Sequence, residues 1–96
     1  ALLAAAATST DARFARPALA RLAEREFADP VSLPAARGHF AEYARRFATA
    51  PDAWVPAIRL GQVAQAEGRR EAAVAAFVAA AEAHPDDAFV RALALA

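Results

Sequence analysis

The side chains that could carry catalytic or metal chemistry are few in this sequence, and they are scattered. The only two histidines, His39 and His84, are far apart in the chain and fall near the ends of predicted helices. A nucleophile needs a base within hydrogen-bond reach, and neither histidine has such a partner at a fixed spacing. A histidine in a last helical turn, as at His84, interacts favourably with the helix dipole. We therefore expect both histidines to be structural.

The remaining reactive residue types give the same result. Glu24 and Glu26 are two positions apart in a predicted helix, which places them on different faces, and we expect both to be solvated. Ser9 and Ser32 fall in cap or loop positions without a neighbouring base. The three glycines are scattered, so no glycine-rich phosphate loop is present. Cysteine is absent, which removes disulfides and thiolate chemistry. The sequence predicts no enzyme, no cofactor and no metal site.

The charged residues point to no polyanionic partner. Eleven basic and eleven acidic residues balance, so no net field attracts nucleic acid. The basic pairs Arg45-Arg46 and Arg69-Arg70 each lie close to a glutamate, and we expect them to face solvent. No apolar run reaches the length that spans a bilayer. We expect a protein or peptide partner, with no nucleic acid and no membrane span.

The elements that position these residues are predicted to be helices. The chain has 33 alanines among 96 residues and few β-branched residues. Alanine is the strongest helix former, whereas strands are rich in β-branched and aromatic residues. The fold class is therefore predicted to be all-α.

Prolines and glycines divide the chain into helix-sized pieces. Pro17 either kinks its helix or marks its first turn, and Gly68 suits a left-handed helix ending. Short connections make neighbouring helices antiparallel. The predicted helices lie within residues 1–7, 11–28, 35–49, 53–67, 70–84 and 87–96, with an irregular loop at 29–34.

Residues 54–87 carry a recognisable set of spaced residues. A leucine–glycine pair in the first helix is followed by an alanine, a glycine at the turn, a small–aromatic–small series in the second helix, and a proline at the end. These residues are Leu60, Gly61, Ala64, Gly68, Ala73, Phe77, Ala80 and Pro85. In this pattern the segment resembles one complete tetratricopeptide repeat. It departs from the family where Ala57 occupies the place of a large residue and Trp54 stands at the start of the helix.

The resemblance implies antiparallel helix–turn–helix repeats stacked as a short solenoid. In such repeats, small residues at Gly61, Ala73 and Ala80 allow two helices to touch. Gly38, Phe40, Tyr43, Phe47 and Ala50 echo the second-helix pattern, although their register relative to the later repeat stays open. The predicted organisation is a single domain with an irregular helical part at 1–33, a degenerate repeat at 34–53, the repeat at 54–87 and the start of a further helix at 88–96.

The resemblance also implies a function, because the first helix of each repeat in this family lines a groove that binds a peptide or a helix. The face that would line the groove carries Val55, Ile58, Arg59, Gln62 and Gln65. The alternative is that Val55 and Ile58 only complete the core. Trp54 likewise either packs between repeats or anchors a ligand.

Two functions follow from this interpretation. The first is a scaffold for protein–protein interaction, formed by a segment of a longer repeat array. The second is a structural helical subunit embedded permanently in a larger complex, without a separable ligand.

Overall fold

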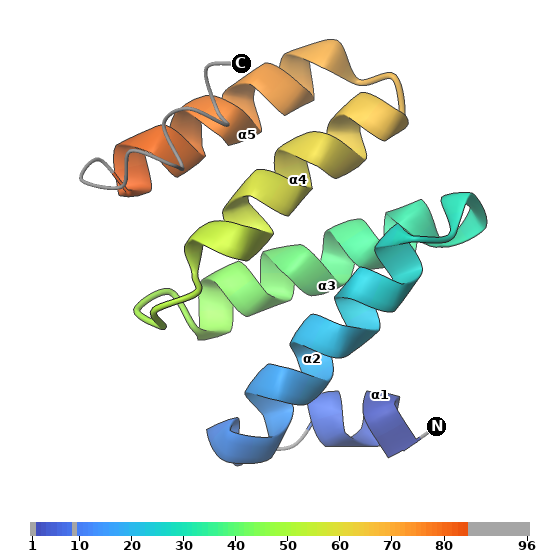
Figure 1. Cartoon of the computed structure of the whole chain (residues 1–96), viewed down its shortest axis with the longest axis vertical. Coiled ribbons are helices and arrows are strands. Elements are labelled where there is room, and N and C mark those ends of the chain that lie inside the picture. Colours follow the sequence, from blue (N-terminus) through green and yellow to red (C-terminus); the bar gives the residue numbers. More distant parts are fainter. Residues whose placement is uncertain (1, 9, 85–96) are drawn as a thin grey trace. The chain divides into compact units, whose positions relative to one another are not determined.

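The regular structure of the chain is entirely helical in the part that the structure describes. The computed structural model describes residues 2–8 and 10–84, and Figure 1 shows its helices. No strand occurs in these residues, so the all-α prediction is confirmed. The helix predicted within 87–96 lies outside the described residues. The elements are α1 (Leu2–Ala7), α2 (Ala12–Phe27), a 3₁₀ turn η1 (Pro30–Ser32), α3 (Leu33–Arg46), α4 (Trp54–Ala66) and α5 (Arg70–Ala83).

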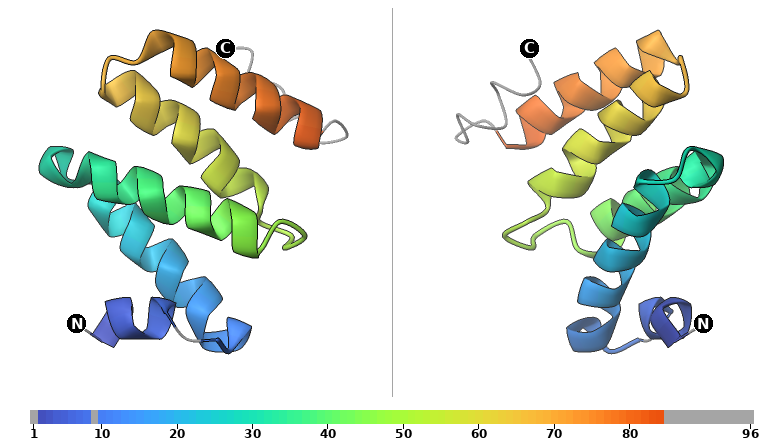
Figure 2. Two further views of the ribbon diagram at one scale, coloured as in Figure 1. Left: turned by 180° about the vertical axis from the view of Figure 1, so that it is seen from behind. Right: turned by 45° about the vertical axis from the view of Figure 1, so that its right-hand side comes forward.

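The chain divides into two compact units, residues 1–48 and 49–96. In the first unit α2 packs against both α1 and α3, and in the second unit α4 packs against α5. Figure 2 shows that α2 and α3 run side by side in opposite directions, as do α4 and α5. Each unit therefore contains one antiparallel helical hairpin, as the short predicted connections require.

Helix α2 begins at a side-chain cap. The Asp11 carboxylate accepts a hydrogen bond from the backbone N–H of Arg13 at 3.0 Å, which satisfies one of the free donors at the helix start. The Arg13 guanidinium also donates to this carboxylate, at 2.9 Å. These hydrogen bonds, the side-chain one first, lower the pKa of Asp11. Pro17 lies inside α2 and not in its first turn.

Helix α3 begins earlier than the sequence suggested. Asp29 accepts hydrogen bonds from the Val31 N–H and the Ser32 hydroxyl, both at 3.2 Å, and so closes the 3₁₀ turn. The helix then starts at Leu33 and places Pro34 in its first turn, where the missing N–H would have had no helical partner. The predicted loop at 29–34 is therefore wrong at its end, and α3 spans 33–46 instead of falling within 35–49.

The core of the first unit joins all three of its helices. Leu19 of α2 and Tyr43 of α3 are buried together with Ala7 of α1. The Arg46 guanidinium donates a hydrogen bond to the Ala7 carbonyl at 2.9 Å and lies 5.0 Å from the centre of the Phe47 ring. The solvent-facing role predicted for Arg46 is therefore wrong, because this side chain ties the end of α3 to α1.

The second unit follows its prediction closely. Helices predicted at 53–67 and 70–84 are found at 54–66 and 70–83. Gly68 has a φ of 75°, in the left-handed region that a side chain makes costly. The left-handed ending predicted for this glycine is confirmed.

The second helices of the two hairpins share the spacing of a buried alanine and a phenylalanine that follows it. In α3 the buried Ala36 is followed four positions later by Phe40, and in α5 the buried Ala73 is followed four positions later by Phe77. Two residues four apart lie on the same face of a helix. Ala36 and Phe40 thus occupy in α3 the places that Ala73 and Phe77 occupy in α5.

Candidate functional site

The α4–α5 hairpin is built around one close approach of backbone to ring. A Cβ atom placed on Gly61 of α4 would lie 2.6 Å from Cδ1 and 2.7 Å from Cζ of Phe77 in α5. Ordinary carbon–carbon contacts are about 3.5–4.0 Å, so any larger residue at this position would require the ring or the helix to shift. The predicted contact of Gly61 with the second helix is confirmed.

The same contact region contains a residue that the sequence assigned to the binding face. Ile58 is only 4% exposed and forms a buried cluster with Ala80, against which Trp54, Ala57 and Phe77 pack. Its assignment to the binding face is therefore wrong, because its position on α4 lies on the same side as Gly61 and faces α5. The alternative that Ile58 completes the core holds for this residue.

The other residues predicted to bind a partner lie at or near the surface of α4. Val55, Arg59 and Gln62 are half-buried, and Gln65 is exposed. The Arg59 guanidinium donates to the Gln62 side-chain carbonyl at 2.8 Å, so these two side chains hold each other in place. Their role in binding stays a prediction.

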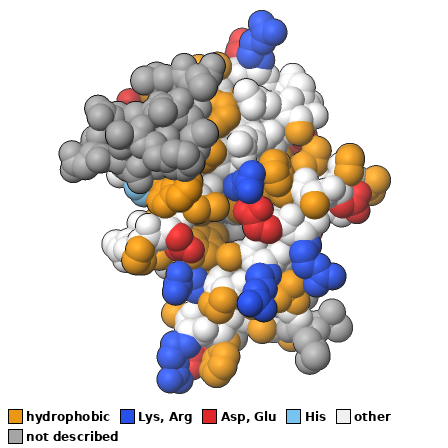
Figure 3. All heavy atoms as spheres, in the orientation of Figure 1, with side chains coloured by type: hydrophobic (Ala, Val, Ile, Leu, Met, Phe, Trp, Pro, Cys, Tyr) orange, Lys and Arg blue, Asp and Glu red, His pale blue; other side chains and the backbone are white. Residues whose placement is uncertain are grey.

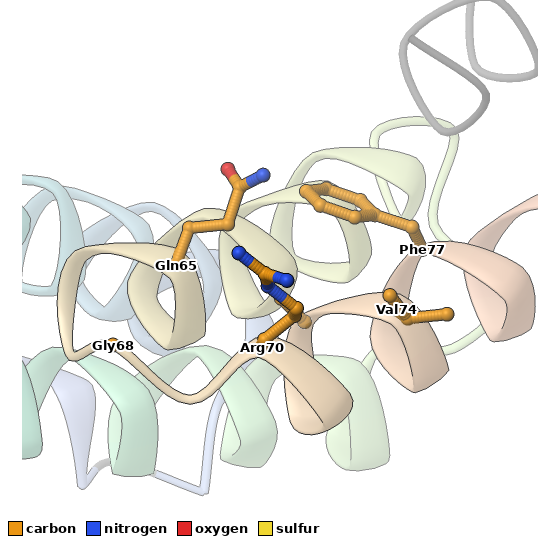
Figure 4. Close-up of a pocket in the computed structure, with 6 residues that line it drawn as sticks. Gln65, Gly68, Arg70, Val74 and Phe77 are labelled. Carbon is orange, nitrogen blue, oxygen red and sulfur yellow. The ribbon is translucent and has the colours of Figure 1, made fainter.

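A depression lies beside the turn between α4 and α5, with a volume of about 330 Å³. Figure 4 shows that Gln65 enters it from the last turn of α4, while Arg70 and Phe77 enter it from α5. Most of its surface is apolar, and the polar side chains that line it are those of Gln65 and Arg70. Its lining residues are Gln65, Gly68, Arg70, Ala73, Val74 and Phe77; we call it the turn pocket.

An apolar strip on α5 continues from the turn pocket. Val74 is 57% exposed and Val78 is 49% exposed, and their spacing of four places them next to each other on the helix surface. The sequence carries a signal for this strip, since these are the only valines in a helix that is otherwise mostly alanine. The family resemblance directed attention to the first helix of the repeat and so missed it.

A second depression, of about 540 Å³, lies between α1 and α2 in the first unit. Leu3 and Ala20 form its apolar part, and Arg21, Glu24 and Arg25 surround them. Charges of both signs line this depression, whereas Arg70 is the one charged residue among those that line the turn pocket.

One histidine–carboxylate pair among the described residues joins α3 to α2. His39 Nδ1 of α3 lies 2.5 Å from Glu26 Oε1 of α2, and the Glu26 side chain is 17% exposed. The predictions that Glu26 is solvated and that His39 is isolated are both wrong, because the packing of α2 against α3 brings these two side chains together. Across residues 2–8 and 10–84, no three metal-ligating side chains cluster.

The surface charges form small mixed groups. On the face shown in Figure 3, basic and acidic side chains lie close to one another. Among the predicted surface pairs, Arg45 Nη2 lies 3.9 Å from Glu42 and Arg69 Nη1 lies 3.8 Å from Glu67. In the described part of the chain, no helix is both long and apolar enough to cross a membrane.

Comparison with known proteins gives no relative: no family model, curated protein or solved structure matches the chain. The tetratricopeptide resemblance therefore rests on the quoted sequence residues alone, and the last of them, Pro85, lies outside the described residues.

Proposed function

We propose that this chain is a protein-interaction domain that binds a peptide or a helix of a partner protein. The observation that carries this proposal is the apolar strip of α5, in which Val74 and Val78 are about half exposed beside the turn pocket; we also call it the α5 surface. Contiguous exposed apolar patches, in contrast to single scattered apolar residues, mark sites of protein interaction.

The hairpin itself does not require these two valines. When α3 and α5 are matched through Phe40 and Phe77, the position of Val74 corresponds to Arg37 and that of Val78 corresponds to Ala41. Arg37 is half-buried and Ala41 is exposed. A polar or small residue thus suffices at these positions in one hairpin, and the valines of α5 serve something other than packing against α4.

The surface of α4 is a second part of the proposed interface. Val55, Arg59 and Gln62 offer one apolar and two polar side chains, and Gln65 connects this surface to the turn pocket. The α5 surface has the stronger claim, because exposed valines gain more from burial against a partner than polar groups that already have hydrogen bonds.

The proposal is tested by affinity capture from source cells with the parent chain and the double variant Val74→Ser, Val78→Ser. The matched control is Ala35→Ser with Ala41→Ser, two exposed helical positions of the first unit. We expect the valine variant to recover at least tenfold less of a specific partner than the parent does, and the control variant to recover as much as the parent. The melting temperatures of all three proteins should be similar. Equal recovery by all three proteins would contradict the proposal.

Size-exclusion chromatography of the chain alone and dilution of the captured complex separate the proposal from a structural subunit. A binding domain stays monodisperse alone and releases its partner on dilution. A permanent subunit precipitates alone and does not exchange its partner.

A further inference from the structure

The turn pocket combines two kinds of chemistry, and the inference drawn from it rests on the proposed binding function. Ala73, Val74 and Phe77 are the apolar side chains that line it; we call them its apolar floor. A volume of about 330 Å³ is at the small end of ligand sites, which are typically about 300–1,000 Å³. It suits a side chain of a bound segment better than a large cofactor.

Arg70 places a positive charge at the edge of this apolar floor. Arg70, Val74 and Phe77 recur at spacings of four and three, so they form one stripe along α5. Figure 4 shows the Arg70 guanidinium extending toward the side of the pocket where Gln65 lies. Its five N–H donors can bind a carboxylate through two parallel hydrogen bonds.

The neighbouring acidic side chains leave this guanidinium unpaired within the described part of the chain. Glu67 pairs with Arg69, at 3.8 Å. Glu71 is exposed and points about 100° away from Arg70 around the helix, as adjacent helical residues do. No hydrogen bond or ion pair joins Arg70 to any residue of the described ranges.

Gln65 completes the pocket from the α4 side. Its exposed amide has both a donor and an acceptor, which match the backbone of an extended segment. The pocket therefore offers an apolar floor, one cation and one amide, and its ligand must present the complementary groups.

We propose that the turn pocket binds a partner segment in which an apolar side chain stands next to an aspartate or glutamate. The apolar side chain enters the pocket over Phe77, and the carboxylate accepts two hydrogen bonds from Arg70.

The experiment is a titration of the ¹⁵N-labelled chain, followed by NMR, with three capped serine–glycine heptapeptides. The first has a central leucine–aspartate pair, the second replaces the aspartate with asparagine, and the third replaces the leucine with alanine. We expect the first peptide to shift the amide signals of residues 65–77. The asparagine peptide should bind about tenfold more weakly, because a charge-assisted hydrogen bond is roughly twice as strong as a neutral one and 1.4 kcal/mol corresponds to tenfold. The alanine peptide should also bind about tenfold more weakly, because it buries less apolar surface in the pocket than leucine does.

Two variants assign the charge preference to one arginine. Arg70→Gln should bind the aspartate and asparagine peptides equally. The matched control Arg69→Gln, which alters a neighbouring exposed arginine, should keep the tenfold preference. An unchanged preference in Arg70→Gln would overturn the proposal.

The outcomes also separate this inference from the proposed function. Equal binding of the aspartate and asparagine peptides by the parent chain would overturn the inference. The proposed function would survive that result, because both peptides would still bind to the apolar residues. The absence of any shift at residues 65–77 would likewise overturn it, and the partner capture with the valine variant would still decide the function.

Discussion

The contact between Gly61 and Phe77 gives the sharpest test of the α4–α5 hairpin. In Gly61→Ala the new methyl carbon would lie about 1 Å too close to the Phe77 ring, since 2.6 Å to Cδ1 compares with roughly 3.5–4.0 Å in ordinary contacts. Overpacking of this kind costs about 1–3 kcal/mol. Alanine is intrinsically better than glycine inside a helix by roughly 1 kcal/mol. The net expectation is a loss of about 0–2 kcal/mol.

Removing the Phe77 ring should reverse the effect of Gly61→Ala on the free energy of unfolding. In a Phe77→Ala background nothing opposes the new methyl group, so Gly61→Ala should stabilise the hairpin by about 1 kcal/mol. The two substitutions should therefore couple by roughly 1–3 kcal/mol in a double-mutant cycle. Phe77→Ala alone should cost less than the approximately 3–5 kcal/mol of a fully buried ring, because Phe77 is only partly buried.

Alanine substitutions at the other two glycines provide controls, because they should change stability in opposite directions. Gly38 lies in α3 with no atom within 4 Å of a built Cβ, and Gly38→Ala should stabilise the chain by about 0.5–1 kcal/mol. Gly68 has open space but a φ of 75°, so Gly68→Ala should cost about 1–2 kcal/mol.

The assay for the cycle is urea unfolding followed by the fluorescence of Trp54. This residue is the single tryptophan of the chain, and it packs against the Ile58–Ala80 cluster, so its signal reports on the α4–α5 hairpin. Equilibrium free energies follow by linear extrapolation. The reasoning is refuted if Gly61→Ala stabilises the parent by as much as it stabilises Phe77→Ala.

Further predictions concern the first unit and the α4 surface. Glu26→Ala should destabilise the α2–α3 hairpin by about 1 kcal/mol, because it removes the hydrogen bond to His39. Glu82→Ala, at an exposed position, should change stability by less than about 0.5 kcal/mol. Urea unfolding measures both variants, and equal effects would contradict a stabilising role for the Glu26–His39 pair. Arg46→Ala should speed amide hydrogen exchange in residues 2–7, because the hydrogen bond to the Ala7 carbonyl is lost. The pKa of Asp11 is lower in the folded state than in the unfolded state. The stability that this carboxylate contributes is therefore present above its unfolded pKa and is lost as the pH falls through its folded pKa. Asp11→Asn should therefore lose less stability on acidification than the parent, as measured by thermal melts at several pH values. Arg59→Ala combined with Gln62→Ala should weaken partner capture without a large drop in melting temperature, and a large drop would assign this surface to the core.

The helices could be predicted from the sequence because local residues determine where they start and stop. Gly68 and the alanine-rich segments placed α4 and α5 to within a residue. The start of α3 was missed because Pro34 reads as a break, although proline is also compatible with a first turn. The close contact at Gly61 could be predicted because its spacing follows the repeat pattern.

The parts of the site that could not be predicted depend on how the helices pack. A helical wheel places Ile58 among the surface residues Val55 and Gln62, but only the position of α5 shows that Ile58 is covered. The pairing of Glu26 with His39 depends on the register between α2 and α3, which no local pattern sets. Arg46 and Ala7 are 39 positions apart in the sequence, and no local pattern predicts the hydrogen bond between them.

The most direct test of the binding role is site-specific photo-crosslinking from the α5 surface in source cells. A benzophenone amino acid is placed at Val78, and in a matched control at Phe14, an exposed apolar position of the first unit. The proposed function predicts one or a few discrete crosslinked products from position 78, absent at position 14 and lost when Val74→Ser is added. Identical patterns from the two positions, or no product at position 78, would contradict it.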